Sequence, residues 1–157
     1  QTLDEYRCLD KVEAMQAPAE KIPLEGQSVD LIWCIGVFMF TRQQEALSEF
    51  QRVLRPGGRL VITANGLGYF LKYVLDGIRY RSRRKTVYGL NGIYNTWYKW
   101  LTGRQLGTSA VSNTEMIKLL DKAGFDLQDT RLWLAHTKYP LEHLGFATNY
   151  AFIAVKR

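Results

Sequence analysis

The sequence predicts an α/β fold built on a parallel βαβ unit, and three observations within residues 29–65 carry this prediction. Residues 30–35 form a short apolar run that is too brief for a helix and suits a buried parallel strand. Apolar residues such as Leu47 and Phe50 then recur at helical spacing. A second apolar run follows at residues 60–64. A strand, a helix and a second strand make one βαβ unit, which is almost always parallel and right-handed.

The ends of the predicted helix are also marked in the sequence. Thr41 and Gln44 match a capping box, in which two side chains bond to open N–H groups at the start of a helix. Pro56 is expected to end the helix. The residues Pro56-Gly57-Gly58 suit a tight turn into the next strand, because proline presets φ and glycine tolerates a positive φ.

Other elements are predicted from the same kinds of pattern. A capping box of Ser112 and Glu115 indicates a helix that Gly124 closes. The remaining expectations are an edge strand at 12–16, helices at 69–80 and 112–123, an aromatic segment at 93–101, and antiparallel strands at 127–134 and 150–155.

Length and composition are those of one globular domain. The chain has 157 residues, of which 46% are hydrophobic, and no apolar run approaches the length of a membrane span. Cys8 and Cys34 are too few for a disulfide framework, and with His136 and His143 they show no metal-ligand spacing. We therefore expect a cytoplasmic protein without a metal site.

Residues 66–107 are expected to form a helical insertion that acts as a cap or lid. This insertion holds eight Lys or Arg residues and one Asp, a balance of +7, whereas the remaining chain holds thirteen and fourteen, or −1. A surface of one sign beside a cleft attracts anions. The alternative is a solvated helical cap whose arginines only aid solubility.

Two segments carry a resemblance to a known family. The residues Ser28-Val29-Asp30-Leu31-Ile32, followed by Glu49-Phe50-Gln51-Arg52-Val53-Leu54-Arg55-Pro56-Gly57-Gly58-Arg59-Leu60, resemble the middle of a class I S-adenosylmethionine (SAM)-dependent methyltransferase. The pattern is similar to that of the small-molecule, type 11-like group. It covers residues 12–65 well and 108–157 more loosely. Most of the matched residues are structural, so the resemblance concerns the fold before it concerns activity.

The resemblance implies a Rossmann-like, doubly wound sheet of the class I methyltransferase type, and it implies SAM as the cofactor. It places the methionine end of SAM against Cys34, Ile35 and Gly36. The family holds adenine with an acidic side chain and the next backbone N–H. Pro18 stands where the acid belongs, so Ala19 would supply the backbone contact and Glu20 would have to replace the acid.

The family also implies a segment that this sequence does not show. Two βα units and a Gly-rich turn that approaches the cofactor are expected before Val29, and neither is recognisable. Residues 1–157 are therefore interpreted as a single, incomplete methyltransferase domain, and the chain alone is expected to be inactive. A fragment of a longer enzyme, a fold completed by another chain or a swapped copy, and a degenerate remnant are the three explanations.

The expected activity is methyl transfer to a small or amphiphilic acceptor, including anionic ones. Candidate acceptor-binding residues are Phe38, Met39, Asn65, Tyr69, Tyr73 and Arg81, although the two in the loop could instead pack on the next helix. For a hydroxyl acceptor, the family reading offers His136 or Tyr139 as the base, whereas a carboxylate or thiolate needs none.

A non-catalytic alternative also fits the sequence. The module would then bind a partner through the basic, aromatic insertion. An RNA-binding surface is a third reading, but nucleic acid is not the expected partner because the resembled group acts mostly on small molecules. Peripheral contact with an anionic membrane is compatible with the insertion, and the sequence leaves the oligomeric state open.

Overall fold

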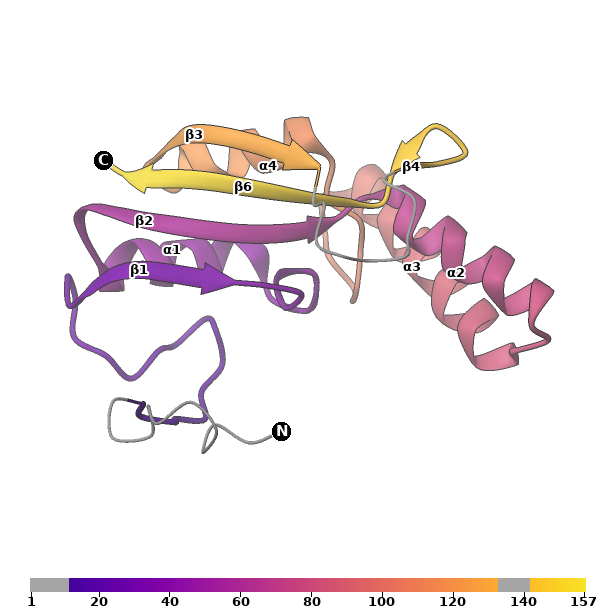
Figure 1. Ribbon diagram of the computed structural model, residues 1–157, viewed down its shortest axis with the longest axis horizontal. Coiled ribbons are helices and arrows are strands. Elements are labelled where there is room, and N and C mark those ends of the chain that lie inside the picture. The colour runs from indigo at the N-terminus through magenta and orange to yellow at the C-terminus, as the bar shows by residue number, and fades with distance from the viewer. Residues whose placement is uncertain (1–11, 133–141) are drawn as a thin grey trace.

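The computed structural model describes residues 12–132 and 142–157, which form one mixed sheet with helices and a projecting helical hairpin (Figure 1). The four-stranded sheet has the order β1 (Val29–Cys34), β2 (Leu54–Asn65), β6 (Asn149–Lys156), β3 (Phe125–Leu132), and β4 (Glu142–His143) pairs with β5 (Phe146–Ala147). The helices are the 3₁₀ turn η3 (Phe38–Phe40), α1 (Gln43–Val53), α2 (Leu67–Arg79), α3 (Arg83–Thr102) and α4 (Asn113–Lys122). No helix of the described residues is long and apolar enough to cross a lipid bilayer.

Strand pairing confirms the predicted βαβ unit. Strands β1 and β2 run parallel, with Leu31 opposite Arg59 and Cys34 opposite Ile62. The last strand, β6, is antiparallel to both β2 and β3, as the sequence predicted. The carboxyl ends of β1 and β2 therefore meet the amino end of β6 at one edge of the sheet.

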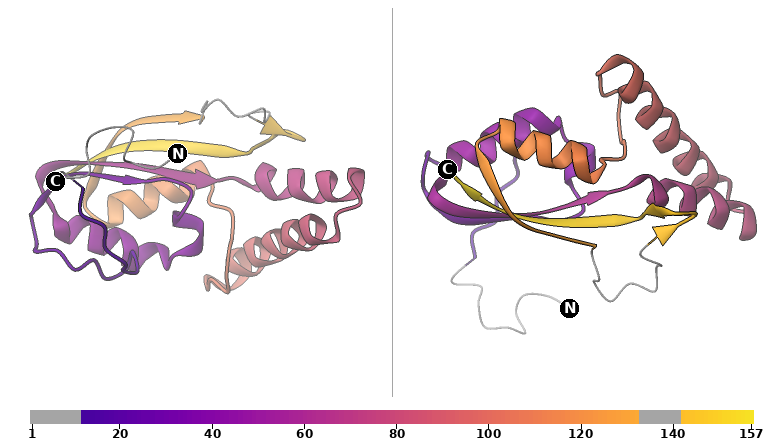
Figure 2. Two further views of the ribbon diagram at one scale, coloured as in Figure 1. Left: turned by 60° about the horizontal axis from the view of Figure 1, so that its bottom comes forward. Right: turned by 90° about the horizontal axis from the view of Figure 1, so that it is seen from above.

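The hydrophobic core lies between the sheet and two helices. Helices α1 and α4 cover the same face of the sheet (Figure 2). Alternate residues of the central strands point into this core, because side chains of a strand alternate between faces. The fully buried members include Leu60, Ile62, Phe152 and Ala154. On β1 and just beyond it, Leu31, Trp33 and Ile35 remain exposed within the part of the chain that the structure describes.

The predicted capping box at the start of α1 is wrong. The N-cap is Arg42, and no side chain caps the helix. The Thr41 hydroxyl instead donates to the Phe38 carbonyl at 2.9 Å and so closes η3. The Arg42 N–H donates to Glu20 Oε1 at 2.7 Å, which ties the preceding segment to the helix. A residue far away in the sequence thus replaces the expected local cap.

The expected turn at residues 56–58 forms as a bulge inside a strand. Helix α1 ends at Val53, and β2 already begins at Leu54. Val29 pairs with Leu54 but Leu31 pairs with Arg59, so β2 bulges out between these two points. Gly57 takes a φ of +74° there, which a side chain rarely tolerates.

Two other element predictions need correction. Residues 12–16 form no regular structure, so the tentative edge strand is wrong. The predicted strand at 127–134 is β3, which begins two residues earlier, at Phe125. The predicted helix at 112–123 is confirmed, with Ser112 as its N-cap.

Glu49 and Arg52 hold the segment before β1 against helix α1. Glu49 Oε1 accepts from the Ile22 N–H at 2.7 Å, and Arg52 donates to the carbonyls of Ile22 and Leu24 at 3.0 and 2.9 Å. The two side chains also pair with each other at 2.7 Å. These residues belong to the family-like segment, and their role here is structural.

Helices α2 and α3 form a hairpin that projects from the carboxyl end of β2 (Figures 1 and 2). The aromatic segment predicted at 93–101 is the second half of α3, which begins at Arg83. Glycines allow the close approach of the two helices. A Cβ on Gly89 would lie 2.7 Å from the Phe70 carbonyl oxygen, and one on Gly92 would overlap the Phe70 ring. The inter-helix contact therefore depends on the absence of side chains.

We expect Gly89→Ala to destabilise the hairpin. At an exposed helix position, alanine is more favourable than glycine by about 1 kcal/mol of helix stability. Here the added methyl group meets backbone, and overpacking of this kind costs about 1–3 kcal/mol. Amide hydrogen exchange should therefore accelerate in α2 and α3. Asn91→Ala, at an exposed position of the same helix, is the matched control and should leave exchange unchanged or slower. Slower exchange in Gly89→Ala would contradict the close packing.

Acid should remove the stabilisation that Glu49 provides. The hydrogen bond from Arg52 holds the pKa of Glu49 below its usual range. Because the folded state lowers this pKa, the stabilisation is complete above the ordinary value of about 4.3 and fades as pH falls through the lowered one. The stability advantage of the native chain over Glu49→Gln, measured by urea unfolding, should therefore shrink as pH falls below about 4. The exposed Glu45 supplies the control substitution, Glu45→Gln, for which a smaller change is expected.

Candidate functional site

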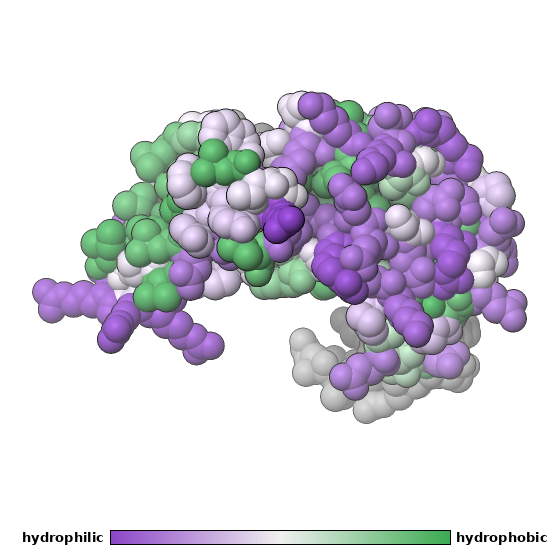
Figure 3. Space-filling model, turned by 180° about the vertical axis from the view of Figure 1, so that it is seen from behind, coloured by the Kyte–Doolittle hydropathy of each residue, from purple (hydrophilic) through white to green (hydrophobic). Residues whose placement is uncertain are grey.

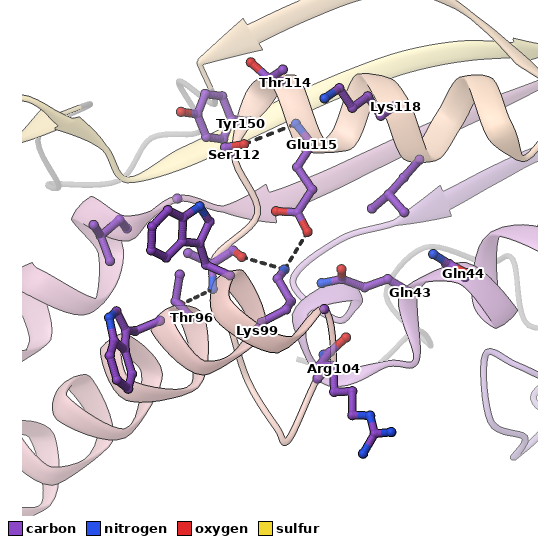
Figure 4. Close-up of a pocket in the computed structure, with 18 of the residues that line it drawn as sticks. Gln43, Gln44, Thr96, Lys99, Arg104, Ser112, Thr114, Glu115, Lys118 and Tyr150 are labelled. Atoms are coloured by element: carbon purple, nitrogen blue, oxygen red, sulfur yellow. Dashed lines mark hydrogen bonds and ion pairs between the residues drawn. The ribbon is translucent and has the colours of Figure 1, made fainter.

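A cavity of about 1220 Å³ lies at the carboxyl edge of the sheet (Figure 4). Its walls come from α3, from the first turns of α1 and α4, and from the ends of β2 and β6. Because α1 and α4 both begin at this edge, the β-α connections bring their polar first turns together here. The lining of the cavity includes Gln43, Leu67, Ile93, Trp97, Lys99, Trp100, Arg104, Glu115, Lys118 and Tyr150.

An ion pair between two helices forms the polar centre of this cavity. Lys99 of α3 lies 2.8 Å from Glu115 of α4, and the Lys99 side chain is only 12% exposed. The Lys99 ammonium also donates to the Ala110 carbonyl at 3.0 Å. Ser112 Oγ accepts from the Glu115 N–H at 3.1 Å, which is half of the predicted capping box. The Glu115 carboxylate pairs with Lys99 and so joins the hairpin to the core.

Gln43 brings a buried hydrogen-bond donor into the same space. The residue is 6% exposed, and its amide points towards Lys99 and Glu115 (Figure 4). Its Nε2 has no hydrogen-bond partner within the described residues. An unpaired buried donor costs about 1–3 kcal/mol, so an oxygen atom of a ligand placed beside it would bind favourably.

The hairpin supplies an apolar wall opposite these polar groups. Leu67 begins α2, and Ile93, Trp97 and Trp100 follow one another at spacings of four and three along α3. Such spacing places the three α3 residues on one side of the helix. Tyr150 of β6 lies across from them. An apolar wall with a few convergent polar groups is typical of small-molecule sites.

The carboxyl end of β1 lies at the same edge of the sheet. The Gly36 N–H donates to Thr63 Oγ1 at 2.9 Å, and Asn65 Nδ2 lies 2.9 Å from the sulfur of Met39. Gly36 has a φ of +69°, and open space surrounds the position that a Cβ would occupy. Cys34 is buried, and desolvation raises its pKa to about 11, so its thiol is neutral and not a nucleophile.

The proposed acceptor residues lie outside the lining of this cavity. Phe38 and Met39 are buried, and Phe38 belongs to the core. Tyr69 and Tyr73 contact each other and Tyr88, and burial raises the pKa of Tyr69. Arg81 lies at the tip of the hairpin, between α2 and α3. His136 and Tyr139 fall outside the described residues.

The segment expected to face adenine is held by other contacts. The Pro18 carbonyl accepts from the Lys21 N–H at 3.0 Å, in a turn that includes Ala19. The Glu20 carboxylate bonds to the Arg42 N–H and lies 3.9 Å from the Arg42 side chain. Oε1 of Glu20 therefore holds the start of α1, and the contact of this side chain with adenine stays a prediction.

Sequence comparison connects this fold to methyltransferases. A family model described as a methyltransferase domain matches residues 2–62. The ubiquinone/menaquinone biosynthesis C-methyltransferase UbiE of Campylobacter jejuni is 33% identical over 122 residues, which cover 75% of this chain and 51% of that protein. The chain thus spans about half the length of this curated relative.

Solved structures of methyltransferases have a similar fold. The methyltransferase CalH in complex with S-adenosylhomocysteine (SAH) superposes with a TM-score of 0.65 at 21% identity, covering 99% of this chain and 38% of CalH. A SAM-dependent methyltransferase from Thermotoga maritima, described as a possible histamine N-methyltransferase, gives a TM-score of 0.59 at 19% identity, covering 93% and 65%.

Residues 2–62 match the methyltransferase domain family in sequence, and the fold of the chain is that of SAM-dependent methyltransferases. The Rossmann-like open sheet is therefore the one that the sequence predicted. SAM is the cofactor named for the Thermotoga maritima protein, and CalH holds SAH. The open, positive-φ position at Gly36 fits a cofactor held through backbone groups at the end of β1.

The sequence does not predict the residues that build the cavity. Trp97 and Trp100 belong to a segment that is recognisably aromatic, but the sequence pattern leaves their side of the helix unassigned. Gln43 carries no signal beyond its place near the start of a predicted helix. The Lys99–Glu115 pair forms between two helices that meet only through tertiary packing, so no local sequence pattern predicts it.

Lys99→Met should loosen the hairpin from the core. The substitution leaves Glu115 and the Ala110 carbonyl without their partner, and a lost buried partner of this kind costs about 1–3 kcal/mol. Urea unfolding should show this loss. Lys118→Met is the matched control, since Lys118 lines the same cavity and forms no ion pair within the described residues. Equal effects of the two substitutions would show that the Lys99–Glu115 pair contributes little.

Proposed function

We propose that this protein is a SAM-dependent methyltransferase whose acceptor binds in the cavity beside α3. One observation carries the proposal: the buried, unpaired amide of Gln43 faces an apolar wall at the carboxyl edge of the sheet. In open α/β sheets, ligands bind at this edge. The acceptor is accordingly amphiphilic, with at least one oxygen atom for Gln43 and an apolar body for Trp97 and Trp100.

The names of the relatives support an aromatic acceptor. UbiE of Campylobacter jejuni is named for C-methylation in ubiquinone and menaquinone biosynthesis. We extend this chemistry to the present chain: the acceptor is an oxygen-bearing aromatic ring with an apolar tail. Its ring lies against the indoles of α3, and a ring oxygen accepts from Gln43 Nε2. Two basic side chains of the lining, Arg104 and Lys118, favour the ionised form of that oxygen.

Methyl transfer requires the protein mainly to bind and align the two reactants, because the cofactor supplies the reactive group. When bound, SAM would supply an electrophilic methyl group on a sulfonium, with the electron pair of the carbon–sulfur bond returning to sulfur, and the ring carbon that accepts the methyl group would lose its proton to water. The backbone of Ile35 and Gly36 would hold the methionine end. Gln43 orients the acceptor and stabilises negative charge on its oxygen, which makes the ring more nucleophilic. Alignment and exclusion of water by the apolar wall supply the rest.

The hairpin is the cap of this site. Residues 66–107 leave from the end of β2, and the part that lines the cavity, Ile93 to Trp100, is anchored to the core by Lys99. In this proposal the half of the hairpin that holds Ile93 to Trp100 shapes the acceptor pocket. The distal half, near the turn between α2 and α3, does not contribute to this pocket.

Substitutions in the wall should separate acceptor binding from cofactor binding. With the native protein, radiolabelled SAM and a naphthoquinol that carries a short alkyl tail, Trp97→Ala and Gln43→Leu should each raise the acceptor KM. The loss of one hydrogen bond or one stacking contact corresponds to about a threefold to tenfold change. The KM for SAM should stay within about twofold, a change of well under 1 kcal/mol.

Trp33→Ala is the matched control, because Trp33 is an exposed indole on the opposite side of the sheet and does not line the cavity. Its kinetic constants should equal those of the native protein. If Trp97→Ala and Gln43→Leu weaken SAM as much as the acceptor, the cavity is not the acceptor site. If the native protein neither binds SAM nor transfers a methyl group, the non-catalytic reading stands instead.

A further inference from the structure

The distal half of the hairpin carries an exposed apolar face. Ile78 is 63% exposed and Leu90 is 51% exposed, although both are aliphatic. Figure 3 shows the hydrophobic residues gathered over the hairpin when the molecule is viewed from behind. The large exposed apolar residues of α2, α3 and their connection are Leu75, Ile78, Tyr80, Val87, Leu90, Tyr94, Trp97, Trp100 and Leu101. A contiguous surface of this kind usually marks an interaction site.

The order of residues along α3 makes this face continuous. Val87, Leu90, Tyr94, Trp97 and Leu101 follow at spacings of three and four, so they form one stripe along the helix. The buried residues Gly89 and Gly92 belong to the side that packs on α2. The stripe therefore faces away from the rest of the hairpin.

A cluster of cations marks the tip of the hairpin. The basic tip consists of Arg79, Arg81, Arg83, Arg84 and Lys85, all of them exposed. Within the described residues, none of these five side chains forms an ion pair. Tyr80 lies between them, with the cations of Arg79 and Lys85 at 5.7 and 5.5 Å from its ring. The long side chains extend from the end of the molecule in Figure 3.

We propose that the α2–α3 hairpin docks this protein on the surface of an anionic lipid bilayer. The apolar stripe would enter the boundary between headgroups and acyl chains, where indole and phenol rings are favoured. The basic tip would lie among the headgroups, and each cation near an anionic surface adds to binding. Aliphatic, aromatic and cationic residues are thus arranged in the way that interfacial helices require.

The distribution of charge favours a bilayer over the two other surfaces that this hairpin could meet. Residues 86–98 of α3 contain no charged side chain, so every cation of the distal half lies at the tip. A nucleic-acid surface would need cations along the aromatic stripe to follow the phosphates. A helical partner held in register would need charged residues beside the stripe. Binding to a bilayer requires neither of these arrangements of charge.

The apolar face also runs directly into the cavity. Trp97 belongs both to the exposed stripe and to the lining of the cavity, and the exposed Trp100 lines the cavity beside it. This last step rests on the proposed function: an acceptor with an apolar tail could pass from the bilayer into the site along these indoles. Docking itself is independent of methyl transfer and can be measured without it.

Vesicle sedimentation of the 157-residue chain tests the docking. The chain should sediment with vesicles of phosphatidylcholine and phosphatidylglycerol, and only weakly with phosphatidylcholine alone. Salt at 1 M, where screening acts beyond about 3 Å, should reduce binding to the weak level. Near-UV tryptophan emission should shift to shorter wavelength with the anionic vesicles as indoles leave water.

Paired variants locate the contact. Arg81→Glu/Arg83→Glu/Arg84→Glu should weaken vesicle binding by about tenfold or more, because each cation contributes separately. Lys21→Glu/Arg59→Glu/Lys122→Glu changes the net charge equally at exposed sites outside the hairpin and should retain most of the binding. Ile78→Ser/Leu90→Ser should also weaken binding, while circular dichroism remains that of the native chain.

Three results would overturn the proposal. Equal losses in the two charge-reversal variants would show a response to net charge alone. Self-association that the two serine substitutions abolish, without any vesicle binding, would assign the stripe to a second copy. Binding of single-stranded RNA that the tip reversals abolish, again without vesicle binding, would assign the tip to nucleic acid.

Discussion

Pairing of β2 on both of its edges is the constraint on which the rest of the structure depends. Its parallel pairing with β1 fixes the carboxyl end of that strand, and its antiparallel pairing with β6 brings Tyr150 opposite Ala64. Everything that has been assigned to a site therefore gathers at one edge: Gly36 beyond β1, the start of the hairpin beyond β2, and Tyr150 at the beginning of β6. The bulge at Gly57 lies at the opposite end of β2, where the irregularity does not disturb this edge.

The residues that resemble the family build the scaffold, whereas the cavity residues come from separate helices. This difference explains which parts the sequence could predict. Glu49, Arg52 and the Pro-Gly-Gly bulge build the scaffold through contacts with nearby segments, and local patterns foretold the strands, the helices and the parallel pairing. The cap of α1 could not be foreseen, because its partner is Glu20, twenty-two residues away. The cavity was missed for the same physical reason. Gln43, Lys99 and Glu115 come together only when three helices pack.

Helix α3 takes part in both the cavity and the exposed apolar surface, because its surroundings differ between its two ends. Near its carboxyl end, Thr96 and Lys99 bond to Ala110, in the connection that leads to α4, and so secure the helix to the core. Near its amino end, the helix contacts α2 and otherwise faces outward. A helix that is anchored to the core at one end and packs on α2 at the other can carry a binding surface on its distal half without disturbing the cavity at its base.

The glycines of the hairpin determine which side chains become available to a ligand. Since Gly77, Gly89 and Gly92 let the helices approach until backbone meets side chain, little room remains between them for large residues. Phe70 fills the space that is left and contacts Tyr69 and Tyr88, which both contact Tyr73. Val74 also lies against Gly89 in this contact, whereas the residues of the stripe lie on the outer surface. The tight contact with α2 therefore occupies one side of α3 and leaves the stripe on the other, with Trp97 also lining the cavity.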